Sequence, residues 1–228
     1  MTDTQLTYLD GYCERAGDAG FWAEPLNAIT NLAFIIAAFL AFTAYRKQQI
    51  PLRQSIDILI LTVLLVAIGI GSTAWHTIAT QKAMLGDVIP IALFIHFYLV
   101  IFLVRIIRFG IWPSIGCWIA FVGISYLFEI ALPNDLLHGT IMYIPAYAVL
   151  ILLLGALRTL SHPAFNALRN VVFIWTASLV FRTIDLEVCP MLHIGTHFLW
   201  HLINAVVLYK LVILLLKYGF VTPSVTTR

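Results

Sequence analysis

The sequence predicts an all-α, polytopic membrane protein: one bundle of seven transmembrane helices, with the N-terminus outside and the C-terminus in the cytoplasm. The chain of 228 residues is 61% hydrophobic and only 11% charged, with a mean hydropathy of +0.96. A soluble domain carries about 25% charged residues. Its apolar runs match the length of a membrane-spanning helix, about 20 residues, and its basic residues gather in alternate loops.

Short polar or turn-forming breaks separate the predicted spans and justify each boundary. In chain order these breaks are Arg46–Arg53, Gln81–Lys82, Arg105–Arg108, Pro133–Asp135, Ser161–Arg169 and Glu187–Gly195. The spans between them are expected at Pro25–Tyr45, Ile56–Ala79, Leu85–Val104, Trp112–Leu132, Leu136–Leu157, Asn170–Leu186 and His197–Leu216. No linker or internal repeat divides the chain, so residues 1–228 are interpreted as one domain, with a polar outer segment at 1–24 and a short cytoplasmic tail at 217–228. Because residues 1–20 lack the apolar core of a signal peptide, we expect the first span to target the chain to the membrane.

The orientation follows from the basic residues. Ten of them fall in the loops after spans one, three and five or at the C-terminal end, and three fall on the other side. The ten are Arg46, Lys47, Arg53, Arg105, Arg108, Arg158, Arg169, Lys210, Lys217 and Arg228; the three are Arg15, Lys82 and Arg182. Since cytoplasmic loops carry an excess of lysine and arginine, the first group marks the cytoplasmic side.

Two histidines four residues apart open the last apolar run. His197 and His201 share one face of a helix, with Cβ atoms about 5–6 Å apart, and that spacing suits two imidazoles on one metal ion. The topology brings His76, from the second span, to the same outer depth. Three neutral histidines with an open position are typical of catalytic zinc, which lowers the pKa of a bound water to roughly 7. The alternative is that these are interfacial histidines hydrogen-bonded to their neighbours.

Further polar residues converge on this depth. Ser72 shares a helix face with His76, and Asp87, Arg182 and Asp185 lie near the outer ends of their spans. Ionisable residues in spans usually face a cavity or each other. We expect Asp87 to accept a proton from water or to orient a ligand histidine, and Ser72 to donate to an oxyanion. The alternatives are small-residue helix packing around Ser72 and a capping role for Asp87.

The remaining histidines have no partner at ligand spacing. We interpret His96 as packed or hydrogen-bonded within its span, and His138 as a residue at the end of an outer loop. His162 and His193 are expected in loops.

The motifs around the candidate residues resemble those of the alkaline ceramidases. Gly71–His76, with Asp87 eleven residues after His76, resembles their Ser-x-x-x-His…Asp motif, and Thr196–His201 resembles their His-x-x-x-His motif. Tyr12–Arg15 and Phe21–Leu32 resemble their N-terminal signature. Order, spacing and position in the spans agree over nearly the whole chain. These enzymes belong to a superfamily of seven-span hydrolases that includes the adiponectin-receptor-like proteins.

The resemblance implies that His76, His197 and His201 hold zinc, that Asp87 is the base and that Ser72 is the oxyanion donor. It implies hydrolysis of the amide bond of ceramide, or of a related N-acylated lipid, to a fatty acid and an amine base. It also implies a disulfide between Cys13 and Cys189. Both cysteines fall on the outer, oxidising side, and Cys117 is left alone in the fourth span.

The resemblance further implies a calcium site in the N-terminal segment, although the sequence departs from the family pattern there. Glu14 and Glu24 match the pattern, but Gly11 and Ala16 stand where the family has Asp and Asn side chains. Calcium accepts flexible sets of oxygen ligands, so a nearby aspartate is expected to substitute.

Asp10 and Asp18 are the aspartates in question. The alternative is that the two glutamates pair with an arginine, Arg15 or Arg182, or cap the first span. The sequence therefore leaves both interpretations of the N-terminal segment open. The glutamates either bind calcium beside the zinc site, or pair with an arginine or cap the first span.

Three functions remain for this sequence. The leading one is a zinc-dependent amidase whose lipid substrate enters sideways from the bilayer. The others are a seven-span receptor or lipid-binding protein with structural zinc, and a transporter, which the lack of internal repeats disfavours. The absence of a basic tail argues against nucleic-acid binding. A bacterial source would place the protein in the inner membrane, and a eukaryotic source in an internal membrane.

Overall fold

The structure, a computed structural model, describes residues 11–133 and 136–220. Every regular element in these two ranges is helical, which confirms the predicted all-α class. The elements are α1 (Pro25–Thr30), α2 (Leu32–Lys47), α3 (Leu52–Ile78), α4 (Gln81–Arg105), α5 (Ile111–Ala131), the 3₁₀ helix η1 (Thr140–Tyr143), α6 (Ile144–Thr159), α7 (Phe165–Thr183), α8 (Asp185–Val188) and α9 (His197–Tyr218).

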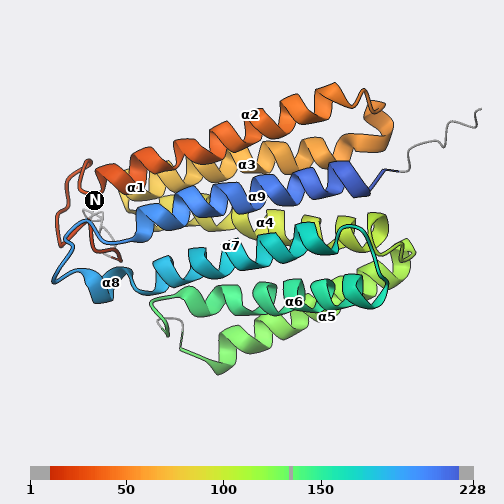
Figure 1. The fold of residues 1–228 in the computed structure, drawn as a ribbon. Coiled ribbons are helices and arrows are strands. Elements are labelled where there is room, and N and C mark those ends of the chain that lie inside the picture. Colours follow the sequence, from red (N-terminus) through yellow and green to blue (C-terminus); the bar gives the residue numbers. More distant parts are fainter. Residues whose placement is uncertain (1–10, 134–135, 221–228) are drawn as a thin grey trace, which may run out of the picture.

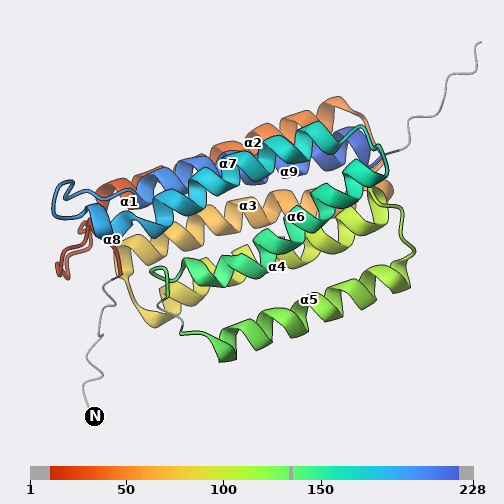
Figure 2. The same ribbon diagram turned by 60° about the horizontal axis from the view of Figure 1, so that its bottom comes forward.

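The long helices lie side by side in one bundle (Figure 1). Helix α9 packs against α2, α3 and α7, and it has the largest buried share of the candidate spans. Helix α5 has the smallest buried share and stands at the edge of the bundle, next to α4 and α6 (Figure 2). The central position of α9 places the residues on its inward faces among several other helices.

Six helical segments in the described ranges are long and apolar enough to cross a membrane, so the chain is an integral, multi-pass membrane protein. The six are Pro25–Lys47, Leu52–Ile78, Gln81–Arg105, Ile111–Ala131, Thr140–Thr159 and His197–Tyr218. The predicted span Asn170–Leu186 corresponds to α7, which has 19 residues but falls outside this set. Helix α7 is less apolar because it carries Arg169 and Arg182, yet it packs beside α6 and α9 within the bundle.

Several predicted boundaries differ from the structure. Helices α3 and α4 each begin four residues before the predicted spans, so the predicted break at Gln81–Lys82 lies in the first turn of α4. The first span is interrupted at Asn31, which separates α1 from α2. The fifth begins only at Thr140, since Leu137, His138 and Gly139 have positive φ angles that a right-handed helix does not allow. The sixth ends at Thr183, and the next residues form the separate short helix α8.

Helices α3 and α4 approach each other closely near the end of α3. A Cβ atom added to Gly71 would overlap the backbone carbonyl of Gly86 on α4, so the two backbones touch at this point. The residues that follow these glycines, Ser72 and Asp87, are buried on adjacent helices. A larger residue at position 71 would push the helices apart and separate these two side chains.

The segment before α1 folds over one end of the bundle. We call this the site end; it is the end where α3 finishes and α4 and α9 begin (Figure 1). A disulfide between Cys13 and Cys189 ties the segment to α8, with the two Cα atoms 5.5 Å apart. The predicted pairing is confirmed, and Cys117 is free and exposed on α5.

Candidate metal centre

Three buried histidines meet at the site end of the bundle. His76 lies in the last turn of α3, and His197 and His201 lie in the first turns of α9. One ring nitrogen from each histidine lies within 4.8 Å of the other two. Tertiary packing therefore brings together the three residues that the sequence predicted as metal ligands. Within the described residues, these three histidines form the one group of three or more His, Cys, Asp or Glu side chains close enough together to hold a metal ion.

The hydrogen bonds of the rings indicate which nitrogens are available. The Nδ1 atom of His76 is hydrogen-bonded to Glu24, and the Nδ1 atom of His201 lies 3.1 Å from the Thr30 hydroxyl. The Nε2 atoms of both rings are buried and lack a hydrogen-bond partner in the described part of the chain, as does Nδ1 of His197. Buried polar atoms are normally satisfied, so these free nitrogens fit a metal ion bound between the rings. Imidazole ligands suit zinc and several other first-row metals.

A buried carboxylate holds the first of these ligands. Glu24 is 2% exposed, and its Oε2 atom accepts hydrogen bonds from Nδ1 of His76 at 2.5 Å and from Nδ2 of Asn27 at 2.9 Å. Its other oxygen accepts a bond from Nε of Arg15 at 2.5 Å. Burial by itself raises the pKa of the Glu24 carboxyl, but the hydrogen bond from His76 and the other N–H donors outweigh burial and lower that pKa. The ionised carboxylate fixes the orientation and tautomer of the ligand ring.

A second carboxylate positions the start of α9. Asp185 accepts hydrogen bonds from the backbone N–H groups of Thr196 at 2.6 Å, His197 at 2.8 Å and Cys13 at 2.9 Å. Gly195 has a φ of +63°, and a Cβ atom there would overlap the Asp185 carboxylate. Asp185 therefore joins the N-terminal segment, α8 and the first turn of α9, and it sets the place of His197.

An aromatic residue from the N-terminal segment packs against the histidines. The ring of Tyr12 lies 3.9 Å from the His197 ring and 4.9 Å from the His76 ring, centroid to centroid. Its hydroxyl accepts a hydrogen bond from Nε1 of Trp75 at 3.4 Å, and burial raises the pKa of this phenol. Tyr12 belongs to the N-terminal motif Tyr12–Arg15, from which no role for it was predicted; in the structure its ring covers one side of the cluster.

Ser72 and Asp87 form the polar wall beside the cluster. Their side chains interact with each other, and the Asp87 carboxylate also interacts electrostatically with His76. Both residues are buried, and Oγ of Ser72 and Oδ1 of Asp87 have no geometrically well-formed hydrogen bond within the described residues. The structure thus places the predicted base and the predicted oxyanion donor together, with polar atoms available for a ligand.

The carboxylates of the expected calcium site have other partners. Glu14 caps α1, since its two oxygens accept hydrogen bonds from the backbone N–H groups of Leu26 and Asn27, both at 2.8 Å. Burial raises the pKa of Glu14 despite these bonds. Asp18 is exposed and accepts a bond from the backbone N–H of Gly20.

Asp10 lies outside the described residues. The pairing of Glu24 with Arg15 and the capping by Glu14 are the alternatives that the sequence left open. Both oxygens of both glutamates accept N–H groups, and this donor arrangement does not fit a calcium ion, which requires six to eight oxygen ligands.

The other histidines lie where the sequence placed them. His96 accepts a hydrogen bond from Nε1 of Trp118 at 3.1 Å, and His138 lies 3.0 Å from Glu187 in an exposed pair. His162 and His193 lie in loops. Burial and then the charge of Arg108 lower the pKa of His162.

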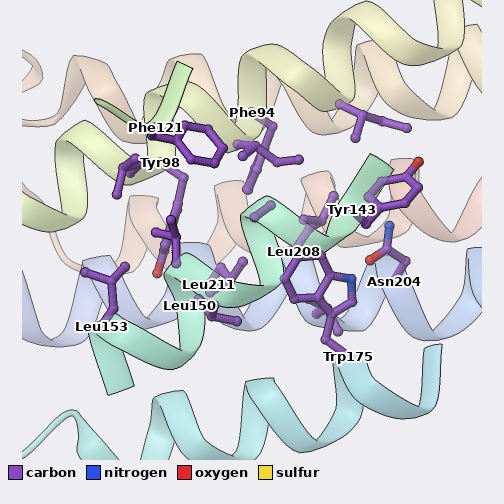
Figure 3. A pocket seen from close by; sticks show the side chains of 16 residues that line it. Phe94, Tyr98, Phe121, Tyr143, Leu150, Leu153, Trp175, Asn204, Leu208 and Leu211 are labelled. Carbon is purple, nitrogen blue, oxygen red and sulfur yellow. The ribbon is translucent and has the colours of Figure 1, made fainter. Parts of the chain in front are cut away.

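An apolar pocket lies within the bundle (Figure 3). It has a cavity volume of about 60 Å³ and is lined by side chains from α4, α5, η1, α6, α7 and α9. Tyr143, Asn204 and Trp175 gather at one end of the pocket, and Leu153 lies at the other (Figure 3). The Tyr143 ring is 5.9 Å from the ring of Trp200, and the Trp200 ring lies 5.3 Å from the His201 ring. Trp200 therefore lies between this end of the pocket and the three histidines.

No protein-family model matches this sequence, and no curated protein matches it. The function is therefore inferred from the chemistry of the cluster and its surroundings.

Proposed function

We propose that the protein is a zinc-dependent amidase of the membrane. It hydrolyses the amide bond of ceramide, or of a related N-acylated lipid, to a fatty acid and an amine base. One observation carries the proposal: a buried three-histidine cluster lies near the buried Ser72 hydroxyl and Asp87 carboxylate, in a bundle that also holds an apolar pocket. The sequence resemblance to the alkaline ceramidases supports the same function.

His76, His197 and His201 would hold the metal, since each offers a buried nitrogen. When bound, zinc supplies a Lewis acid for the amide carbonyl and a source of hydroxide at neutral pH. Glu24 keeps the His76 ring in one orientation through its hydrogen bond to Nδ1. Asp185 holds the backbone of His197, so the ligands are set by the protein before substrate binds.

Asp87 and Ser72 supply the proton transfer and the charge stabilisation. Asp87 accepts the proton of the attacking water and delivers it to the amine nitrogen as the C–N bond breaks, which keeps the leaving group neutral. Ser72 has a hydroxyl without a well-formed bond to another residue. It donates a hydrogen bond to the amide oxygen as negative charge develops there.

The apolar pocket accommodates the acyl chain. Its lining is almost entirely aliphatic and aromatic, and its polar end lies against Trp200, which packs on His197. A chain seated there would place the first carbonyl near the histidines. The substrate enters sideways from the bilayer, because both of its hydrocarbon chains are insoluble in water.

We also propose that α7 crosses the membrane, which brings the number of spans to seven. It packs against α6 and α9. Its charged residue Arg182 donates hydrogen bonds to the Thr140 hydroxyl and to the His138 carbonyl. With seven spans the N-terminus lies outside and the C-terminus in the cytoplasm, in agreement with the distribution of basic residues.

Elemental analysis and a hydrolysis assay on the purified protein test the function together. We expect about one zinc per chain, release of fatty acid from a fluorescent N-acylated lipid, and loss of both in the double variant His197→Ala/His201→Ala. A protein without metal would overturn the proposal. Zinc with a complete set of four protein ligands and no turnover would instead favour a receptor with structural zinc.

A further inference from the structure

We propose that the guanidinium of Arg15 is a built-in cation that does the work the family resemblance assigns to calcium. It neutralises Glu24, ties the N-terminal segment to α3 and, through Glu24, positions the ligand His76. The protein therefore needs no calcium. This role of Arg15 lies outside substrate binding and hydrolysis, because Arg15 supports the residues of the proposed metal centre.

The burial of Arg15 is the first observation. Its side chain is 1% exposed, which is exceptional for a residue whose charge is permanent. A buried charge is destabilising unless it is paired and hydrogen-bonded. A buried arginine in the N-terminal segment thus requires a specific electrostatic role.

The contacts of Arg15 define that role. Its Nε atom donates to Oε1 of Glu24 at 2.5 Å, Nη1 donates to the Asp18 carbonyl at 3.1 Å and Nη2 donates to the His76 carbonyl at 3.2 Å. One planar group thus gathers oxygens from the N-terminal segment, from the residue before α1 and from the last turn of α3. A bound divalent cation would organise the same kinds of oxygen.

The donor arrangement favours guanidinium over calcium. Calcium requires six to eight oxygen ligands at about 2.3–2.6 Å, whereas both Glu24 oxygens already accept N–H groups. Gly11 and Ala16 contribute no side-chain oxygen. Arginine has five N–H donors in a fixed plane, which suits a carboxylate and neighbouring carbonyls. A calcium ion placed there would also be repelled by the guanidinium.

Arg15 acts on His76 at two points. Nη2 binds the backbone carbonyl of His76, and Glu24 transmits the second contact to the ring, since it accepts from Arg15 on one oxygen and from His76 on the other. Without the guanidinium, the buried carboxylate would lose its counter-charge, and the ring would lose its fixed orientation. Arg15 is accordingly a positioning residue for the metal ligand.

Cobalt substitution provides the test, because the visible absorption of bound Co²⁺ reports the ligand geometry independently of hydrolysis. In Arg15→Ala we expect the affinity for Co²⁺ and Zn²⁺ to fall about 10–100-fold, as when outer partners of metal ligands are removed, together with an altered spectrum. Guanidinium ions at millimolar concentration should restore the wild-type spectrum, and urea, which has the same shape without the charge, should not. Arg53→Ala, an exposed arginine at the start of α3, is the matched control.

Calcium is tested on the wild-type protein in detergent after removal of divalent ions and reloading with zinc. We expect no calcium binding by calorimetry and no change in Tm on adding calcium. Stoichiometric calcium binding that raises Tm would overturn the proposal, as would an Arg15→Ala variant with unchanged metal affinity.

If Arg15→Ala does not fold, Arg15→Lys keeps the charge but loses the planar fork, and we expect an intermediate metal affinity. Wild-type affinity in Arg15→Lys would refute positioning by the guanidinium. A wild-type protein that binds neither Co²⁺ nor Zn²⁺ would refute the metal centre itself, whereas the calcium measurement would still decide whether Arg15 takes the place of calcium.

Discussion

The Glu24 carboxylate accepts a hydrogen bond from Nδ1 of His76 at 2.5 Å, across 52 residues of sequence. This bond leaves Nε2 of His76 free and turned to the same cluster as the nitrogens of His197 and His201. A carboxylate on the outer nitrogen of a ligand histidine fixes the ring and makes it a better donor to a metal. The candidate centre is therefore organised by residues that are not themselves ligands.

The first prediction concerns this carboxylate. Glu24→Gln should lower the zinc affinity about 10–100-fold, because the neutral amide is a weaker acceptor for His76 and removes the negative charge that pairs with Arg15. Competition with a chromophoric chelator measures the affinity. Glu187→Gln alters an exposed carboxylate that also contacts a histidine and should leave the affinity unchanged. Equal affinities in the two variants would argue against this role for Glu24.

The second prediction separates catalysis from metal binding. Asp87→Asn should retain zinc but reduce turnover about 10²–10⁴-fold, since the amide cannot accept and return a proton. Metal content and the rate of fatty acid release are measured on the same preparation. Turnover close to that of the wild type, with zinc present, would sink the role of Asp87 as the base.

The third prediction concerns the backbone that begins α9. Gly195→Ala should destabilise the protein by about 1–3 kcal/mol from the positive φ alone, and further because the new Cβ atom would overlap the Asp185 carboxylate. Thermal unfolding in detergent measures the change. Gly116→Ala on α5 is the control: nothing lies within 4 Å of its added Cβ atom, so Tm should be unchanged or higher. A fall of the same size in both variants would contradict this explanation.

The fourth prediction concerns the disulfide. Cys13→Ser/Cys189→Ser should lower the free energy of unfolding by about 2–4 kcal/mol, because the bond constrains the unfolded chain. The bridge joins residues 176 positions apart. Reduction of the wild-type protein should reproduce the loss in Tm, and Cys117→Ser should not affect it. If reduction leaves Tm unchanged, the bridge contributes no stability.

The fifth prediction concerns the pocket. Leu150→Trp should fill space within it and lower kcat/KM for long-chain substrates while zinc remains bound, because the larger ring competes with the acyl chain. Leu152→Trp, on the exposed face of the same helix, is the control. Turnover of substrates with graded acyl lengths measures the effect, and an equal loss in both variants would point away from the pocket as the acyl site.

The sequence was sufficient for the all-helical membrane class and for the three histidines that the structure brings together. Apolar runs of about 20 residues predict membrane helices because an unpaired backbone is costly in lipid. The four-residue spacing of His197 and His201 places both on one helix face. Depth in the membrane added His76, Ser72 and Asp87, and the structure brings these residues together. The disulfide followed from the resemblance and is confirmed.

The supporting contacts were decided by tertiary structure alone. Glu24 binds His76, and Asp185 binds the backbone of Cys13 across 172 residues. Such bonds have no sequence period, since they join a carboxylate to whichever N–H groups the chain places nearby. The sequence offered Glu24 three roles, as a calcium ligand, as the partner of an arginine or as a cap of the first span. The fold adds a fourth, as the hydrogen-bond partner of His76.

Local sequence thus determined which residues share a helix face and that the chain has several helices apolar enough to cross a membrane. Only the packing of those helices decided which buried charges neutralise each other. In this protein the fold pairs Glu24 with Arg15 at the candidate metal centre. The pair is stable because a buried carboxylate requires a counter-charge and the Arg15 guanidinium lies within hydrogen-bond distance.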